Sequence, residues 1–337
     1  MRNKLLPLVA ASLLLQAPFC ASAQNTSASS PKMAVVATST CYLRTSADYT
    51  SELETQALMG ALVEITGSQS YWRQVKTNYP RPLWVNELSL TELTDVHHYL
   101  AADKYIVSYA GVAYALAEPA QYSARVCDLV LGDVLRMAHD DGGAAVQANG
   151  YAKALLPDER EVWVPVDVLA PYGEWVNSRE LTGKNVVASA LDFLGVPYFW
   201  GGFSIKGVDC SGLSGLAYML NGLILPRNAS QQVKCGVEVP LGHNNDKLEK
   251  LRKGDLLFFG RAAENGKKEA ITHVGIYIGD GKMIHSSQVV RINSLVAGSN
   301  EYYKRNILHA RRIIGHELEG APVKRLSLEI LPCSPVE

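Results

Sequence analysis

The stretch Gly207-Val-Asp-Cys-Ser-Gly-Leu-Ser-Gly215 places Cys210 at the head of a segment of small residues that suits a helix. A thiol at a helix N-terminus feels the positive end of the helix dipole, which lowers its pKa and favours the thiolate. Two histidines follow, His273 and His285, both in strand-like segments. A cysteine with later histidines is typical of a thiol nucleophile served by an imidazole base. Taken singly, Cys210 could be a buried structural cysteine, and either histidine could be a hydrogen-bonded sheet residue.

The segments around the two histidines predict a hairpin. Alternation along a strand puts His273 on one face of residues 272–279 and Val274 on the other, which we expect to face the core. Gly279-Asp-Gly281 is a hairpin turn sequence that would bring His285 close to His273. A polar group that accepts the N–H of a catalytic histidine fixes its tautomer, and His285 can serve as that group.

The rest of this region predicts an α+β domain. Apolar periodicity indicates a helix over 186–194, ended by Gly195-Val-Pro197, and a second helix from Cys210 that closes at Asn221-Gly222. Strands are expected afterwards, at 255–259, 272–278, 282–285 and 309–314. Helices followed by an antiparallel sheet are typical of the α+β class.

Residues 34–170 read as β-rich, with short alternating segments between turn residues. A weak internal repeat is visible: Met59-Gly60 and Leu131-Gly132 each precede a strand-like segment, and Trp84-Val85 and Trp163-Val164 each close a copy. We expect two small barrels of about 60–75 residues rather than one large sandwich. The pattern resembles bacterial SH3-like domains, whose usual Leu-Arg near the start is supplied in the first copy by Leu43-Arg44.

The N-terminus predicts export. Arg2 and Lys4 precede an apolar run over 5–19, and Ala21-Ser-Ala23 is a cleavage sequence, so residues 1–23 are expected to be a signal peptide and 24–33 a linker. The run is too short for a membrane span. Cys20 follows the bulky Phe19, so no lipid anchor is expected. The mature protein should be a soluble periplasmic or extracellular monomer of bacterial origin, and a net charge of -1 gives no reason to expect nucleic acid or membrane partners.

The cysteine pattern favours a free thiol at the site. Of six cysteines one lies in the predicted signal peptide, and an odd number remains, so at least one thiol stays unpaired. We expect that thiol to be Cys210, and the others to be buried small residues: Cys41, Cys127, Cys235 and Cys333. No CxxC spacing occurs, so no zinc site, other metal or cofactor is predicted.

Residues 183–316 resemble the NlpC-type cysteine peptidases, which share a papain-like core. The matching segments, in order, are Gly-Val-Pro-Tyr-Phe-Trp-Gly-Gly at 195–202, Val-Asp-Cys-Ser-Gly at 208–212, Leu-Pro-Arg-Asn-Ala-Ser-Gln-Gln at 225–232, Gly-Asp-Leu-Leu-Phe-Phe at 254–259, Thr-His-Val-Gly-Ile-Tyr-Ile-Gly at 272–279 and Ile-His at 284–285. The resemblance implies that Cys210 is the nucleophile, His273 the base and His285 the orienting residue. It also implies an oxyanion site formed by the Cys210 backbone N–H and a nearby donor such as the Tyr198 hydroxyl.

Two SH3-like domains before such a core resemble the γ-D-glutamyl-L-diamino acid endopeptidase subgroup, also called dipeptidyl-peptidase VI, which requires a free N-terminal L-Ala. By that resemblance Asp209 would pair with the α-ammonium of L-Ala. Ser211 would hold the substrate beside Asp209, and Trp200 and Ser230 match further pocket positions. An acidic and a tyrosyl residue of the first SH3-like domain would close the cleft, for which Glu52 and Tyr79 are the candidates.

The expected fold is therefore an α+β, papain-like core at 173–320 after SH3-like barrels at 34–95 and 96–172, with a tail at 321–337. The expected reaction releases L-Ala-γ-D-Glu from peptidoglycan-derived peptides. One alternative is a cell-wall binding protein with an inactive catalytic domain; another is a thiol amidase or acyltransferase on a different substrate. The sequence leaves open lysine or diaminopimelate as the third substrate residue, and intact wall or released peptides as the target.

Overall fold

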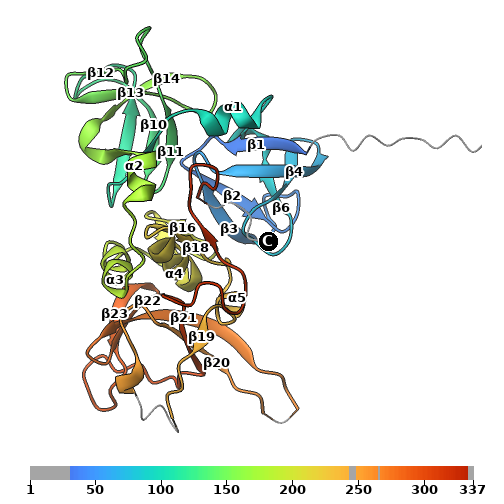
Figure 1. Ribbon diagram of the computed structural model, residues 1–337. Helices are drawn as coiled ribbons and strands as arrows, with labels where there is room; N and C mark the ends of the chain where they lie inside the picture. Colours follow the sequence, from blue (N-terminus) through green and yellow to red (C-terminus); the bar gives the residue numbers. More distant parts are fainter. Residues whose placement is uncertain (1–30, 243–247, 265, 333–337) are drawn as a thin grey trace, which may run out of the picture. The chain divides into compact units, whose positions relative to one another are not determined.

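The computed structural model describes residues 31–242, 248–264 and 266–332 (Figure 1). The predicted signal peptide, Cys20, most of the predicted linker and Cys333 lie outside these residues. Within the described ranges, every helix is too short or too polar to cross a membrane.

The first sheet has seven strands in the order β3-β2-β6-β5-β4-β1-β7. Its strands are β1 (Lys32–Val36), β2 (Thr40–Arg44), β3 (Leu53–Leu58), β4 (Leu62–Gln69), β5 (Trp72–Lys76), β6 (Leu83–Asn86) and β7 (Leu90–Glu92). A short 3-10 helix, η1 (Glu87–Ser89), connects the last two. Helix α1 (Val96–Ala101) then begins at Asp95, whose carboxylate accepts from the backbone N–H groups of His97 and His98.

The second sheet repeats the topology of the first. Its order, β10-β9-β14-β13-β11-β8-β15, matches the first sheet position by position, and β12 adds to β13. Its elements are β8 (Lys104–Val107), β9 (Val112–Leu116), β10 (Arg125–Val130), β11 (Val134–Met137), β12 (Gln147–Ala148), β13 (Tyr151–Leu155), β14 (Glu161–Pro165), η2 (Val166–Val168) and β15 (Leu169–Pro171). The predicted β-rich repeat is confirmed. The predicted closed barrels are not found, because neither sheet pairs its two ends among the described strands.

The two N-terminal copies touch at equivalent turns. Gly60 and Gly132 both have positive φ, +84° and +95°. A Cβ on Gly60 would lie 2.4 Å from the backbone oxygen of Val134, so only glycine fits there. The buried Asp133 carboxylate accepts from the backbone N–H of Met59 at 3.0 Å. The turn glycines of the repeat therefore serve the contact between the copies as well as the turns themselves.

The C-terminal region packs helices on a six-stranded antiparallel sheet in the order β19-β24-β20-β21-β22-β23. The strands are β19 (Val237–Glu238), β20 (Leu256–Arg261), β21 (Ala270–Gly279), β22 (Lys282–Ser287), β23 (Val289–Ser294) and β24 (His309–Arg312). The helices are α2 (Tyr172–Asn177), α3 (Gly183–Leu191), α4 (Cys210–Met219), α5 (Ala229–Gln232) and the 3-10 helix η4 (Leu248–Lys250). Two small pairs complete it, β16 (Phe203–Ser204) with β17 (Gly207–Val208), and β18 (Leu223–Ile224) with β25 (Lys324–Arg325).

These elements confirm the helix from Cys210 and the four predicted strands. The first predicted helix is present but lies three residues earlier than expected, from Gly183 to Leu191, so Gly195 does not end it. It begins there because the Thr182 side chain accepts from the Asn185 N–H. Asp280 and Gly281 both have positive φ, as the predicted two-residue hairpin turn requires. Strand β23 was not predicted.

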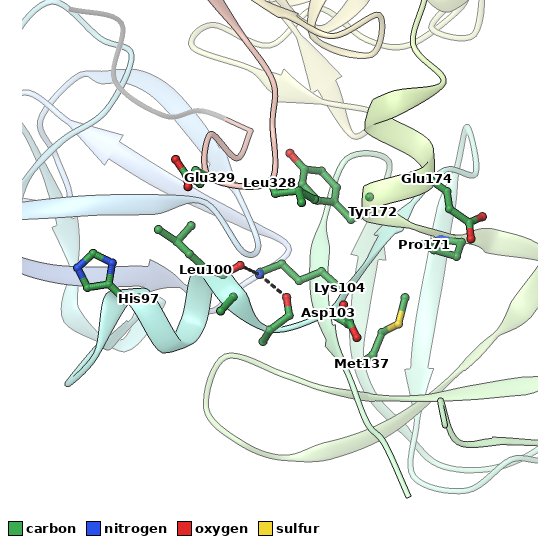
Figure 2. Close-up of a pocket in the computed structure, with 13 residues that line it drawn as sticks. His97, Leu100, Asp103, Lys104, Met137, Pro171, Tyr172, Glu174, Leu328 and Glu329 are labelled. Atoms are coloured by element: carbon green, nitrogen blue, oxygen red, sulfur yellow. Dashed lines mark hydrogen bonds between the residues drawn. The ribbon is translucent and has the colours of Figure 1, made fainter. Parts of the chain in front are cut away.

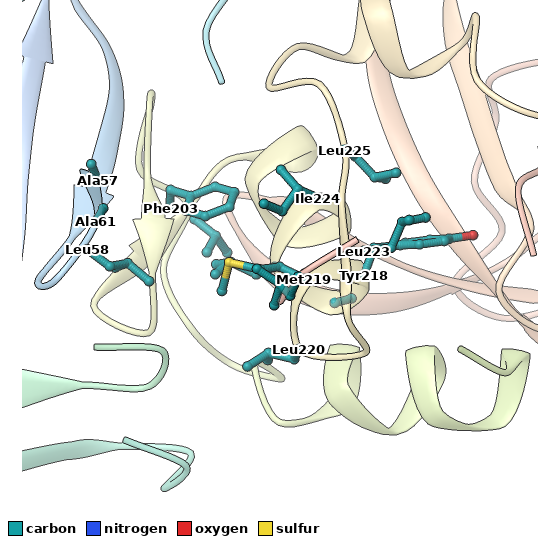
Figure 3. Packing of buried hydrophobic residues seen from close by; sticks show 14 of the residues in the cluster. Ala57, Leu58, Ala61, Phe203, Tyr218, Met219, Leu220, Leu223, Ile224 and Leu225 are labelled. Atoms are coloured by element: carbon teal, nitrogen blue, oxygen red, sulfur yellow. The ribbon is translucent and has the colours of Figure 1, made fainter. Parts of the chain in front are cut away.

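One apolar core runs from the first sheet to α4. Ala57 and Leu58 of β3 lie beside Phe203, which packs toward Met219 of α4 (Figure 3). All four side chains are buried. This continuity holds β3 against the helix that begins at Cys210, and it brings a strand of the N-terminal region to the site.

The segment predicted to be a tail packs against the fold as far as the structure describes it. The Tyr172 hydroxyl donates to the backbone oxygens of Ser327 and Ile330, at 3.1 and 3.3 Å, and Leu331 is buried. A cavity of about 750 Å³ lies between this segment, α1 and α2 (Figure 2). Beside it the Lys104 ammonium donates to the carbonyl oxygens of Leu100 and Ala102, and so closes the C-terminus of α1.

Candidate active site

Cys210 is the first residue of α4, and the Asp209 carboxylate caps the helix by accepting from the Gly212 N–H at 2.7 Å. The predicted placement at a helix N-terminus is thus confirmed. The predicted effect on the thiol is not, because burial raises the pKa of Cys210 to about 11, and the neighbouring Asp209 charge acts in the same direction. Hydrogen bonds from the backbone N–H groups of Val274 and Ser211 oppose this shift without cancelling it. The raised pKa favours the neutral thiol over the thiolate.

His273 lies beside this thiol. Its neighbour Val274 donates its backbone N–H to the Cys210 sulfur, and its other neighbour, Thr272, lines the same cavity as Cys210. A β-bulge places the residue here: Phe259 pairs with His273, but Gly260 pairs with Ile271, so Thr272 is the extra residue. Bulges re-aim side chains near active sites.

His273 is the first member of a buried chain of polar groups. Its Nε2 lies 2.7 Å from Nδ1 of His285, and Nε2 of His285 lies 2.8 Å from Oδ1 of Asn293. Asn293 in turn donates through Nδ2 to the backbone oxygen of Glu301 at 2.7 Å. Gly275 sits between the histidines on β21, and a Cβ there would lie 3.3 Å from the His285 Cβ.

The hydrogen bonds of this chain fix both histidine tautomers. The Glu301 carbonyl can only accept, so Asn293 turns its amide nitrogen toward it and its oxygen toward His285. His285 then carries its proton on Nε2 and accepts at Nδ1. His273 must therefore donate from Nε2, which leaves its Nδ1 free to accept a proton.

Both imidazoles are neutral in this environment. Burial lowers the pKa of His273 to about 3, and the positive charge of Arg305, or of His285 if it were protonated, acts in the same direction. Burial also lowers the pKa of His285, although the hydrogen bond that His285 donates to Asn293 acts in the opposite direction. A neutral thiol beside a neutral imidazole suits proton transfer during attack rather than a standing ion pair.

Asn293 was missed by the sequence prediction. It lies on β23, which pairs with β22 so that Asn293 stands opposite Met283, two residues before His285 on the same face. The β-branched residues in the run 289–292 are the signal that could have revealed a third strand, and alternation would then have placed Asn293 beside His285.

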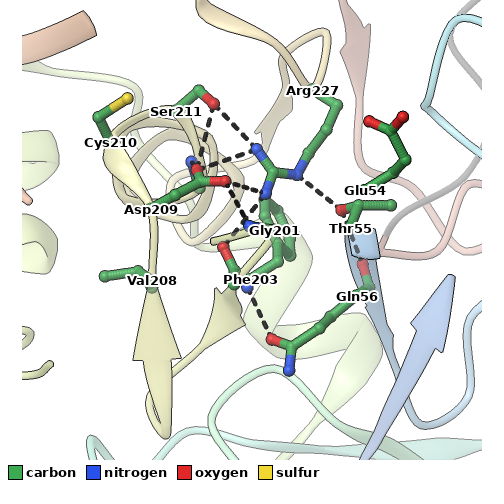
Figure 4. A network of polar contacts seen from close by, with 12 residues as sticks. Glu54, Thr55, Gln56, Gly201, Phe203, Val208, Asp209, Cys210, Ser211 and Arg227 are labelled. Atoms are coloured by element: carbon green, nitrogen blue, oxygen red, sulfur yellow. Dashed lines mark hydrogen bonds and ion pairs between the residues drawn. The ribbon is translucent and has the colours of Figure 1, made fainter. Parts of the chain in front are cut away.

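Arg227 fills the space next to Cys210, between Asp209 and the first sheet (Figure 4). It is 2% exposed. Its guanidinium donates to both Asp209 oxygens at 3.0 and 2.6 Å, to the Ser211 hydroxyl at 2.9 Å, to the Gly202 carbonyl at 3.3 Å and to the Thr55 hydroxyl at 2.6 Å. One buried cation therefore joins β3 to the residues on both sides of the nucleophile.

This network changes the role expected for Asp209. Its Oδ1 accepts from Gly212 N–H, Ser211 and Arg227, and its Oδ2 accepts from Arg227 and the Gly201 N–H (Figure 4). A carboxylate offers about four lone-pair positions, and five donors already occupy them. Asp209 and Ser211 both line the cavity. The Asp209 carboxylate is already paired with Arg227 and caps the helix, so it has no free position for an ammonium.

Glu54 is the carboxylate that faces the cavity instead. It accepts hydrogen bonds from the Tyr79 hydroxyl and, at 2.5 Å, from Arg81. Tyr79 also bonds to Asn228, and burial raises the pKa of the Tyr79 hydroxyl above its usual value, with the Glu54 hydrogen bond adding to this. Glu54 and Asn228 line the cavity at Cys210, and Tyr79 connects them from behind.

The expectation for Glu52 needs a correction. Glu52 is exposed and is not among the described residues that line the cavity. It precedes β3 (Leu53–Leu58), whereas Glu54 is the second residue of that strand and shares its proximity to the site. Of these two acidic residues, Glu54 lines the cavity, two positions further along the chain than the predicted Glu52.

The cavity at Cys210 has a volume of about 310 Å³. Besides Cys210, five predicted site residues line it, together with Glu54, which the sequence prediction missed. The full lining is Glu54, Tyr198, Trp200, Asp209, Cys210, Ser211, Asn228, Ala229, Ser230, Ile271 and Thr272. Burial raises the pKa of the Tyr198 hydroxyl to about 12, and the negative charge of a Cys210 thiolate would act in the same direction. Tyr198 therefore stays protonated and can donate a hydrogen bond to an oxyanion.

Among the described cysteines, Cys210 alone lines the cavity. Cys210, Cys127 and Cys235 are free thiols; Cys235 and Cys41 are buried, and Cys127 is half-buried. Within the described residues, no cluster of three or more His, Cys, Asp or Glu side chains is placed to hold a metal ion.

Comparison with known proteins agrees with this geometry. Residues 195–312 match the model of the NlpC/P60 family. The γ-D-glutamyl-L-lysine dipeptidyl-peptidase of Bacillus subtilis is 30% identical over 269 residues, which cover 77% of this chain and 81% of that protein. The murein DD-endopeptidase MepS/murein LD-carboxypeptidase of Escherichia coli K12 is 34% identical over 176 residues, or 51% of this chain and 86% of that one.

The fold also matches a solved structure along most of its length. The crystal structure of an NlpC/P60 family protein from Bacillus cereus superposes with a TM-score of 0.66 at 24% identity, covering 83% of this chain and 99% of that chain. The likeness therefore extends through the N-terminal sheets as well as the region that contains Cys210.

Proposed function

The chain belongs to the NlpC/P60 family, and from this premise we propose that it cleaves the γ-D-glutamyl–L-diamino acid bond of peptidoglycan-derived peptides that have a free N-terminal L-Ala. The products are L-Ala-γ-D-Glu and a peptide or amino acid that begins with the diamino acid. The observation that carries this proposal is the cavity that Glu54, hydrogen-bonded to Tyr79, lines together with Cys210. We assign the N-terminal sheets to two SH3-like domains, at 34–95 and 96–172, before a catalytic domain at 173–320.

The first half of the reaction forms a thioester. Cys210 gives its proton to Nδ1 of His273 as the sulfur attacks the γ-carbonyl carbon of D-Glu. The carbonyl oxygen becomes an oxyanion, which the Cys210 backbone N–H and the Tyr198 hydroxyl stabilise. The C–N bond then breaks, and His273 returns its proton to the departing amine of the diamino acid.

The second half consumes water. His273, neutral again, takes a proton from a water molecule that attacks the thioester carbon. The tetrahedral intermediate collapses, the C–S bond breaks and the sulfur recovers its proton. Throughout, His285 and Asn293 hold the His273 ring and keep its Nδ1 toward the reacting atoms.

The N-terminal amine of the substrate is assigned to Glu54 rather than to Asp209. The five donors on Asp209 make that carboxylate a structural group. Glu54 keeps a side chain at the cavity wall, between Tyr79 and Arg81. Acetylation removes the positive charge of the amine and adds bulk that hinders a hydrogen bond to Glu54. The acetylated peptide should therefore bind poorly.

The proposal is tested with L-Ala-γ-D-Glu-L-Lys and its N-acetylated form. The wild-type protein should prefer the free amine by roughly 100-fold in kcat/KM, because a partly desolvated charge pair is lost on acetylation. Glu54→Gln should remove most of that preference, whereas the matched variant Glu52→Gln should retain it. Cys210→Ala should cleave neither peptide. Equal cleavage of both peptides by the wild type would overturn the amine-binding role of Glu54.

Two alternatives predict different results. A cell-wall binding protein with an inactive catalytic domain would cleave neither peptide, although the neutral thiol and the base beside it argue for activity. A thiol amidase or acyltransferase on another substrate would transfer or hydrolyse acyl groups regardless of a free amine. The Glu54 position at the end of the cavity favours an amine-bearing peptide over an apolar acyl chain.

A further inference from the structure

The direction in which the diamino acid leaves is set by His273. The acyl half of the substrate takes the cavity that Glu54, Trp200 and Ser230 border. The departing amine receives its proton from His273, so the diamino acid must lie along the flank of that imidazole. The residues packed on His273 outside the cavity are therefore candidates for contact with its side chain.

Tyr303 forms that flank. Its ring centroid lies 6.0 Å from that of His273 and 4.9 Å from that of His285, and its edge-to-face partner Phe259 is 5.0 Å away. The position is anchored, because the Tyr303 backbone N–H donates to the Ser294 carbonyl at 2.9 Å, at the end of β23. Tyr303 is only half-buried and so presents part of its ring to a ligand.

A cationic side chain stands just beyond this ring. Arg305 is exposed, donates a hydrogen bond to the Tyr303 hydroxyl, and its positive charge is felt at His273. A recess of about 240 Å³ opens here, lined by Tyr302, Tyr303 and Arg305 together with the apolar side chains of Leu295 and Val296. Among the described residues, no carboxylate forms an ion pair with Arg305.

The nearest acidic residue along the chain does not neutralise this charge. Glu301 is engaged by Arg291 at 2.8 Å. Lys304 adds a second exposed positive charge to the same segment. The flank of His273 is therefore basic, whereas Glu54 adds a carboxylate to the lining of the cavity at Cys210.

We propose that the Tyr303–Arg305 recess binds the distal carboxylate of a diaminopimelate side chain, so that the protein prefers diaminopimelate over lysine as the leaving residue. This rests on the proposed peptidase function. Lysine ends in an ammonium alone, whereas the distal carbon of diaminopimelate carries a carboxylate beside its ammonium. An unpaired guanidinium attracts the carboxylate and repels a lone ammonium.

The distal carboxylate fits better than the α-carboxylate of the same residue. The α-carboxylate is attached one carbon from the departing nitrogen and would lie at His273 itself. Arg305 lies one aromatic ring further out, because it bonds to the hydroxyl of Tyr303 while that ring packs on His273. The methylene groups of the diamino acid can cover this ring, and the apolar side chains of Leu295 and Val296 complete the recess.

The test compares L-Ala-γ-D-Glu-L-Lys with L-Ala-γ-D-Glu-meso-diaminopimelate. Each peptide is used as the free acid and as the amide of the α-carboxylate of its diamino acid. The wild-type protein should favour the diaminopimelate peptide by roughly tenfold in kcat/KM, the scale of one charge-assisted contact at a partly exposed site. That ratio should fall to within about twofold of unity in Arg305→Gln. Lys304→Gln, which removes the same charge one residue away, should keep the wild-type ratio.

Each outcome decides the proposal. A ratio that persists in the α-amides and disappears only in Arg305→Gln supports the distal carboxylate. A ratio near unity in the wild type, or one unchanged by Arg305→Gln, overturns it, and so does a ratio lost on α-amidation. If neither peptide is cleaved, the proposed function fails, and calorimetric binding of both peptides to Cys210→Ala with and without Arg305→Gln still shows whether the recess selects diaminopimelate.

Discussion

At the scale of single residues, the two buried basic side chains Arg227 and His273 differ in their charge state. Arg227 is charged, and its guanidinium donates hydrogen bonds to Asp209, Ser211 and Thr55. His273 is neutral, because burial disfavours its charged form and the positive charge of Arg305 acts in the same direction. The charged residue is therefore a fixed part of the structure, and the neutral one is free to gain and lose a proton during the reaction.

The neutral state of His273 predicts acid sensitivity. Its pKa is about 3 when folded and about 6.5 when unfolded. The unfolded state therefore binds a proton first as the pH falls, so stability is intact above pH ~6.5 and declines by about 1.4 kcal/mol per pH unit below it, until the folded pKa is reached. The free energy of unfolding in urea should fall by about 2 kcal/mol between pH 6.5 and 5 through this group alone.

Variants isolate this contribution. His273→Gln cannot titrate and should show a shallower decline over the same pH interval, measured as the change in urea midpoint at constant m-value. His97→Gln, at an exposed position on α1, is the matched control and should follow the wild type. A slope for His273→Gln equal to that of the wild type would mean that His273 has nearly the same pKa in the folded and unfolded states.

At the scale of elements, strand β23 supplies Asn293, the hydrogen-bond partner of His285 that the hairpin of β21 and β22 does not contain. The hairpin sets His285 against His273, but the orientation of His285 depends on Asn293 at the end of β23. Asn293 also fixes the loop that leads to Tyr303, through its bond to the Glu301 carbonyl. Strand β23 thus positions both the hydrogen-bonded series from His273 to Asn293 and the segment that carries Tyr303.

This arrangement predicts that Asn293 is a positioning residue. Asn293→Ala should lower kcat by roughly 10- to 100-fold with little change in KM, because an unmade hydrogen bond at a buried imidazole costs 1–3 kcal/mol. Asn293→Asp keeps the acceptor for His285 and should restore part of kcat. Its carboxylate favours protonated histidine, so the acid limb of the pH–rate profile should move to higher pH. Equal losses in both variants with an unmoved profile would reduce Asn293 to a packing role.

How much of the site could be predicted from the sequence follows the same division. Cys210, His273 and His285 each stand in a local motif, and a two-residue turn links the histidines, so their neighbourhood was predictable. The roles of Asp209 and Glu54 were not, because they depend on Arg227 bringing in Thr55 from 172 residues away. The closed barrels failed for a related reason: alternation predicts strands, but it does not say whether the ends of a sheet pair.

At the scale of the whole molecule, the N-terminal sheets and the catalytic region share one apolar core. Gly132 of the second copy approaches both Leu58 of the first sheet and Met219 of α4, since a Cβ there would lie 2.9 and 3.3 Å from their side chains. Lys206 of the catalytic region bonds to Ser39 of the first copy and to Asp128 of the second. Glu54 therefore reaches the cavity from a sheet that is held at several points.

The turn contact between the copies gives a test of this coupling. Gly60→Ala would place a Cβ 2.4 Å from the Val134 oxygen at a φ of +84°, whereas Gly143→Ala meets nothing within 4 Å at a φ of +80°. Both variants carry the strain of a left-handed alanine, about 1–2 kcal/mol. Only Gly60→Ala adds a backbone clash, so its free energy of unfolding should fall by roughly 2 kcal/mol more than that of Gly143→Ala.

The coupling should also appear at the active site. Because Gly60 adjoins β3 through Leu58 and Met59, displacement of this turn should move Glu54 and weaken the preference of the protein for a free N-terminal amine. Urea denaturation gives the stability difference, and the ratio of kcat/KM for the free and acetylated peptides gives the displacement at the site. Gly143→Ala should retain the wild-type ratio. If Gly60→Ala lowers stability no more than Gly143→Ala and keeps the ratio, the two copies can separate at this turn without disturbing the cavity, and Glu54 is held by Arg227 and the core alone.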